Sequence, residues 1–247
     1  MNQDKERILK RQTGCGCIGW LFKSLSSSIG QKVVMAVTGL ALCGFLIVHL
    51  GGNLLLYVGD GKKYNDYAHA LHAQDILLLV AEIGLLVTFV LHIWLAFRTS
   101  FQNSAARPID YAVRQSKMDP GPLAVPPSGV MLGTGIVVLI FLLVHLSDFK
   151  FFEETHQTGL RHQSVSVQSE PFARAVGILK DPISAVVYFV GSLVLGYHVW
   201  HGFESAFQTL GLNHPKYTPL IKTVSLVFAL VVGVGFASFP FWVWAFK

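Results

Sequence analysis

The chain has 247 residues, of which 52% are hydrophobic and only 13% are charged, and its net charge is +5. Soluble domains carry about 25% charged residues, so this composition excludes an ordinary soluble globular domain. The positive charge does not indicate a nucleic-acid partner, because Lys and Arg of a membrane protein gather in its cytoplasmic loops. The three cysteines are too few and too scattered to form a disulfide framework.

The apolar residues collect in five long runs, each of a length typical of a membrane span. The predicted spans cover about residues 31–58, 75–99, 127–149, 181–209 and 218–246. Backbone groups in hydrocarbon must pair within their own segment, so the spans should be helices. The sequence therefore predicts an all-α membrane protein with one transmembrane domain over residues 1–247, and shows no evident internal repeat.

Lysine and arginine are distributed unevenly between the two sides of the predicted topology. With the N-terminus inside, the inner segments carry twelve of these residues and the outer segments seven. This bias predicts a cytoplasmic N-terminus and an outer C-terminus.

Each of the first four spans contains one histidine at membrane depth. These residues are His49, His92, His145 and His198. Ionisable residues at this depth are rare and are functional candidates by default. Each lies 15 or 16 residues into its apolar run, about 23 Å along the helix.

The alternating direction of the helices sorts these histidines into two pairs. His49 and His145 should lie together near the outer side, and His92 and His198 near the inner side. The same helical rise separates the two levels by about 10–18 Å. Two imidazoles facing each other are the ligand set of a six-coordinate haem b, whereas zinc or copper would need three or four donors at one level. Packing histidines and a proton relay are the alternatives.

An ordered set of motifs accompanies the four histidines. The sequence runs SIGQKVVMAVTGL, FLIVHLGGN, KYNDYAH, LHIW, NSAARPIDY, FLLVHLSDF and GYHVWHGFESAFQTLG. In this order the motifs resemble the single-chain, five-helix, dihaem cytochrome b subunit of succinate:quinone oxidoreductases, the succinate dehydrogenases and fumarate reductases. The resemblance covers about residues 27–211.

The resemblance implies the same pairing of ligands, His49 with His145 and His92 with His198. It also implies two partner subunits on the cytoplasmic face, an FAD flavoprotein and an iron–sulfur protein. Electrons would pass between the iron–sulfur protein, the two b haems and a quinone, typically menaquinone, in a bacterial cytoplasmic membrane. This chain would not oxidise succinate alone.

Further candidates surround the predicted ligands. His201 is three residues after His198 and is its only rival as a ligand, or else a residue near a haem propionate. Candidates for quinone, proton or haem-edge contacts are Asn53, His69, His72 and Glu82. Candidates for pairing with haem propionates are Lys32, Lys62, Lys63, Arg98 and Arg107. One relative has a proton-transferring Glu where this chain has Gly196.

Two other functional classes are compatible with buried histidines. A proton-coupled transporter would often show inverted repeats and broken helices, and neither is evident. A dihaem cytochrome b of a hydrogenase or formate dehydrogenase usually places two of its four ligands on one helix, whereas this chain has one per helix. The direction of the reaction and the type of quinone stay open.

Overall fold

The computed structural model describes residues 17–106, 127–151 and 170–247, and this part of the chain is helical and contains no strand. Five helices are long and apolar enough to cross a membrane, which confirms the predicted fold class. They are α3 (Ser28–Asn53), α5 (Asp75–Ala105), α6 (Pro127–Leu146), α8 (Pro182–Thr209) and α9 (Thr218–Phe246).

Several helix boundaries differ from the predicted spans: α3 ends at Asn53 and α6 at Leu146, before the predicted ends at residues 58 and 149. Helix α3 begins at Ser28, because the Ser27 side chain accepts a hydrogen bond from the Gly30 amide at 3.1 Å and caps the helix. Helix α5 continues to Ala105, past the predicted end at residue 99. The added turns are polar, so they lay outside the apolar run that defined the span.

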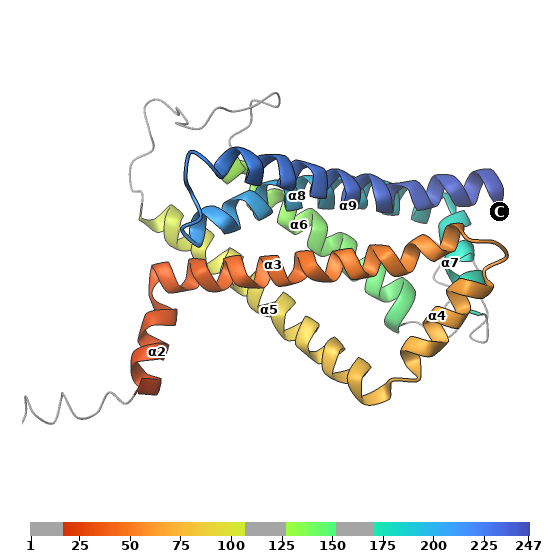
Figure 1. Cartoon of the computed structure of the whole chain (residues 1–247), viewed down its shortest axis with the longest axis horizontal. Coiled ribbons are helices and arrows are strands. Elements are labelled where there is room, and N and C mark those ends of the chain that lie inside the picture. The colour runs from red at the N-terminus through yellow and green to blue at the C-terminus, as the bar shows by residue number, and fades with distance from the viewer. Residues whose placement is uncertain (1–16, 107–126, 152–169) are drawn as a thin grey trace, which may run out of the picture.

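Three short helices lie at the ends of the long ones (Figure 1). Helices α4 (Lys62–His72) and α7 (Pro171–Lys180) lie together near the C-terminus, and α2 (Cys17–Ser26) lies at the opposite end. Two short turns, η1 (Leu54–Tyr57) and the π-helical η3 (Ser147–Phe151), follow α3 and α6. The segments of α2, α4 and α7 lie outside the predicted spans, in parts of the chain expected to be loops.

The most extensive packing joins α8 and α9. Gly196 and Gly233 let these two helices approach closely, as small residues do in membrane helices. Helix α5 packs mainly against α3 and diverges from it toward the α4 end (Figure 1). Its most apolar stretch is not buried by the rest of the chain. The membrane must therefore cover much of α5.

Candidate functional site: two levels of paired histidines

His49 of α3 and His145 of α6 lie side by side in the bundle. Their ring centroids are 5.7 Å apart and the rings are nearly perpendicular. Aromatic rings surround them: Phe45 and Phe236 lie 5.2 Å and 5.6 Å from His49, and Phe149 lies 5.1 Å from His145. The pair predicted from helix direction is thus brought together in an apolar environment.

A polar cluster borders this pair on the side of α7. The Tyr188 ring lies 6.0 Å from the His145 ring, and its hydroxyl donates to Asp148 Oδ2 at 2.9 Å. Arg174 donates to the Asp148 backbone carbonyl at 2.9 Å. Sequence reasoning missed these three residues, and the only available indication was an acidic residue three positions after a predicted ligand.

His92 and His198 each contact a threonine on a neighbouring helix. The Thr38 hydroxyl lies 3.2 Å from Nδ1 of His92, and the Thr134 hydroxyl lies 3.1 Å from Nδ1 of His198. Helix α3 supplies the first threonine and α6 the second.

A glycine follows each of these threonines and lies against the same imidazole. A Cβ added to Gly39 would be 3.2 Å from Cε1 of His92, and one added to Gly135 would be 3.3 Å from Cε1 of His198. Each ring therefore rests on a helix surface that has no side chain at the point of contact.

The threonines fix the distance between the two levels. Thr38 precedes His49 by eleven residues on α3, and Thr134 precedes His145 by eleven residues on α6. At 1.5 Å per residue, the level of His92 and His198 lies about 16 Å from the level of the other pair. This value falls within the range predicted from the sequence.

These contacts reveal an internal repeat in the chain. The prediction that the chain has no repeat was therefore wrong. Residues 34–50 and 130–146 share Val-Met, then Thr-Gly, then Phe-Leu-x-Val-His-Leu at the same spacing. Residues 92–102 and 198–208 share His-x-Trp, then Phe, then Phe-Gln. Helices α3 and α5 are thus repeated as α6 and α8. The repeat is parallel, because one span lies between equivalent helices and they therefore run in the same direction, and it differs from the inverted repeats of many transporters.

The spacing of His49 and His145 fits two axial ligands of one haem iron. Two metal–imidazole bonds of about 2 Å each place the ligand ring centroids about 6 Å apart, close to the 5.7 Å found for His49 and His145. Within the described ranges, no group of three or more His, Cys, Asp or Glu side chains is placed to hold a metal ion. The donors come as two and two.

His201 packs against its own helix. Its ring lies 4.7 Å from Tyr197 and 4.9 Å from Trp200, and it stacks on the latter. Nε2 of His201 is buried and has no hydrogen-bond partner within the described part of the chain. Nothing in these contacts pairs His201 with His92, so His198 remains the stronger ligand candidate.

Asn53 is held close to the first histidine pair. Its amide Nδ2 donates to the backbone carbonyl of His49 at 2.8 Å, and its Oδ1 accepts a long hydrogen bond of 3.5 Å from the Tyr64 hydroxyl. Burial raises the pKa of the Tyr64 phenol, and Tyr67 raises it further. Tyr64 therefore stays protonated at neutral pH and acts as a donor.

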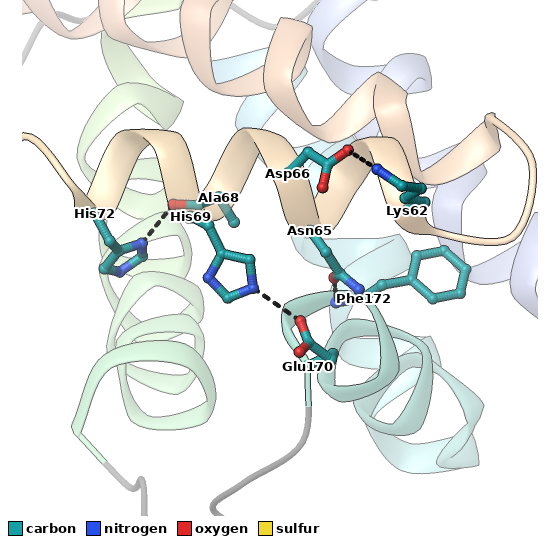
Figure 2. A network of polar contacts seen from close by, with 8 residues as sticks. All are labelled: Lys62, Asn65, Asp66, Ala68, His69, His72, Glu170 and Phe172. Atoms are coloured by element: carbon teal, nitrogen blue, oxygen red, sulfur yellow. Dashed lines mark hydrogen bonds and ion pairs between the residues drawn. The ribbon is translucent and has the colours of Figure 1, made fainter.

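His69 and His72 lie on the exposed surface of α4 (Figure 2). His69 Nε2 is 2.9 Å from the Glu170 carboxylate, which lies just before α7. His72 Nδ1 donates to the Ala68 carbonyl at 2.8 Å. Asn65 joins the same two helices by accepting from the Phe172 amide at 2.8 Å. His69 and Asn65 thus join α4 to the start of α7, whereas His72 contacts only its own helix.

Glu82 on α5 forms an ion pair with Lys150 of η3, with an Nζ–Oε1 distance of 2.6 Å. Both side chains are about half exposed to the space outside the protein. The pair connects the diverging part of α5 to the end of α6. A cation thus compensates the charge of Glu82, and a role for this residue in quinone or proton handling stays a prediction.

The propionate candidates lie at both ends of the bundle. Arg98 stacks over the Trp94 ring at 5.0 Å, and Lys62 pairs with Asp66 at 2.6 Å. Lys32 and Lys63 are exposed. Arg107 lies outside the described residues. Of the four candidates that the structure describes, Arg98 and Lys62 contact Trp94 and Asp66 rather than a histidine of either pair.

Comparison of the chain with protein-family models, with curated proteins and with solved structures finds no match. The functional assignment therefore rests on the four histidines, their surroundings and the motifs of the sequence.

Proposed function

We propose that this chain is the membrane-anchor cytochrome b subunit of a succinate:quinone oxidoreductase. The observation that carries the proposal is the placement of His49 beside His145, with rings 5.7 Å apart on two helices that a sequence repeat relates. The second pair of equivalent histidines, His92 on α5 and His198 on α8, lies at a level about 16 Å away, as measured along α3 and α6. Two pairs at two levels suit transfer across a membrane.

His49 with His145, and His92 with His198, would each hold one haem b. Such a group supplies reversible one-electron chemistry at an iron without an open coordination position. Aromatic rings surround the outer pair, and threonine hydroxyls contact the inner pair. A dry and rigid surrounding reduces the reorganisation that accompanies each charge transfer.

The partners of the proposal are an FAD flavoprotein and an iron–sulfur subunit. They dock on the cytoplasmic face, at the end of the bundle where α2 begins and α5 ends. The chain relays electrons between the iron–sulfur subunit and a quinone, which we expect to be menaquinone, in the cytoplasmic membrane of a bacterium. Support for these partners comes from the motif resemblance and from the excess of cations at this end.

The test is a reduced-minus-oxidised optical spectrum of the purified chain, with haem quantified per polypeptide. We expect two b haems in the wild type and one in His145→Ala and in His198→Ala. The matched control is His72→Ala, because His72 lies on the exposed surface of α4 and contacts only a backbone carbonyl. It should retain both haems.

A haem-free wild type would overturn the proposal and leave the four histidines as packing or proton-relay residues. Loss of haem from the His72→Ala control as well would also contradict it. Subunits that co-purify with the chain distinguish the proposed complex from a hydrogenase or formate dehydrogenase. Turnover of succinate or fumarate by the isolated complex then tests the substrate class.

A further inference from the structure

The threonine hydroxyls that contact His92 and His198 donate their hydrogen bonds within their own helices. Each donates to backbone carbonyls of its own helix, one turn back: Thr38 at 2.9 Å and 3.0 Å, and Thr134 at 3.0 Å and 3.1 Å. A hydroxyl has one proton and two acceptor lone pairs. With its proton used by the helix, each threonine oxygen can only accept from the imidazole beside it.

An accepting oxygen determines which ring nitrogen carries the proton. The contact is made to Nδ1 in both cases. A neutral imidazole that donates from Nδ1 has its lone pair on Nε2. The free nitrogen is therefore the one on the far side of the ring from the threonine.

We propose that Thr38 and Thr134 are positioning residues that hold His92 and His198 in the Nδ1–H tautomer and so make Nε2 of each the metal-binding nitrogen. The inference rests on the proposed function for its consequence, although the tautomer itself does not depend on a bound cofactor. Two independent positions in the chain make the same contact, and the sequence repeat makes them equivalent. Gly39 and Gly135 complete the arrangement by letting each ring lie flat against the helix that carries its threonine.

The surroundings of the other histidine pair are different. The rings of His49 and His145 contact aromatic side chains, Phe45 and Phe236 on one side and Phe141 and Phe149 on the other. The two levels therefore differ in how their imidazoles are oriented. A partner that accepts from a metal-bound imidazole makes it a more basic ligand, which affects the redox potential.

The first experiment reads the tautomer without any cofactor. Haem-free protein labelled with ¹⁵N-histidine is compared by solid-state NMR as wild type, Thr134→Val and Thr134→Ser, with His198→Gln to identify the resonances of His198. One buried hydrogen bond corresponds to about a tenfold bias between tautomers. We expect His198 to be predominantly Nδ1–H in the wild type and in Thr134→Ser, and to lose about that tenfold bias in Thr134→Val.

Thr134 is the better position for this test than Thr38. The backbone carbonyl of Met35 also lies within reach of the His92 ring and offers a second acceptor there. The matched control is Thr99→Val, because Thr99 is buried in α5 and bonds to the Leu95 carbonyl at 2.7 Å but to no imidazole. The control should leave every histidine resonance unchanged.

The second experiment uses the haem-loaded protein. Thr134→Val should shift the electron paramagnetic resonance signal and the midpoint potential of one low-spin haem and leave the other unchanged. Thr134→Ser should restore both, because it keeps the accepting oxygen. A change caused only by packing would not follow the hydroxyl in this way.

An Nε2–H tautomer for His198 in the wild type would overturn the inference, as would a Thr134→Val protein with an unaltered tautomer ratio. Neither result would touch the proposed function, which depends on the number of haems bound. Conversely, a haem-free wild type with an Nδ1–H His198 would overturn the proposed function and leave the orienting role of the threonines intact.

Discussion

Gly196 of α8 and Gly233 of α9 lie directly against each other. A Cβ at Gly196 would be 2.8 Å from the Gly233 Cα and 3.0 Å from the Ala229 carbonyl oxygen. Backbone atoms cannot move aside as a flexible side chain can. The position therefore has no room for a larger residue.

We expect Gly196→Ala to destabilise the protein by about 1–3 kcal/mol, because the methyl group forces α8 and α9 apart. The control is Gly84→Ala on α5, where no atom lies near the added Cβ. That change should be neutral or slightly stabilising, since alanine favours a helix over glycine by about 0.5–1 kcal/mol. Thermal unfolding in detergent measures both. Equal midpoints for the two variants would contradict the close packing.

Gly135, beside His198, can be tested by a similar substitution, with haem occupancy as the measured quantity. A Cβ at Gly135 would be 3.3 Å from the His198 ring, whereas nothing lies near one at Gly133. Gly135→Ala should displace the ring by a few tenths of an ångström and lower haem occupancy from two towards one per chain. Gly133→Ala should retain the occupancy of the wild type. Haem titration of the two variants measures the difference.

Asp181 links two helices by ending α7 and capping α8. Its side chain accepts from the Ser184 amide at 2.8 Å. Asp181→Ala should reduce the free energy of unfolding by about 1 kcal/mol, because it leaves helix donors unpaired. Asp181→Asn keeps an accepting oxygen and should retain most of that stability. Denaturant titration compares the three proteins, and equal losses in both variants would show that the cap is not the cause.

The buried Tyr64 makes stability depend on alkaline pH. Burial and the neighbouring Tyr67 raise the pKa of its phenol above the usual 10.0 in the folded protein. The neutral phenol is therefore favoured by folding, and this contribution is full below pH 10 and is lost as the pH rises through the higher folded value. The wild type should lose stability more steeply than Tyr64→Phe above about pH 10. Parallel unfolding curves for the two proteins would contradict this assignment.

The pair of Glu82 and Lys150 should act through its two opposite charges. Both side chains are about half exposed, so solvent screening limits the coupling to roughly 0.2–1 kcal/mol. Glu82→Lys should destabilise the protein, and the exchanged variant Glu82→Lys with Lys150→Glu should recover most of the loss. Thermal midpoints of the four proteins of this cycle measure the coupling. Additive losses would show that the two residues do not interact.

The spans and the histidine levels followed from the sequence because both depend on simple periodicity. Each apolar run fixes a helix in a membrane, and the rise per residue fixes the depth of His49 or His145 within it. The direction of alternate helices then sorts the histidines into pairs. None of these steps requires knowledge of side-chain packing.

The remaining features depend on contacts between segments that the sequence does not order in space. Helix α4 is polar and begins after Gly61, which adopts a positive φ of 93°, so it lacked both an apolar run and a side-chain cap. Asn53 donates to the backbone carbonyl of His49 one turn earlier, and its predicted contact with a haem edge stays a prediction. Thr38 carries no functional signal by itself, because threonine is common in membrane helices. Only its equivalence to Thr134 in the repeat distinguishes it.

The repeat also explains why the two halves of the bundle have different neighbours. Positions Ser192 and Gly196 on α8, which are small and buried against α9, correspond on α5 to Leu86 and Val90, which are 60% and 57% exposed. One copy of the duplicated helix, α8, thus has small residues at these positions and packs there against the fifth spanning helix, α9. The other copy has bulky aliphatic residues at these positions, and in a membrane hydrocarbon covers them. The two copies of the helix therefore differ in what covers this face, protein in one case and lipid in the other.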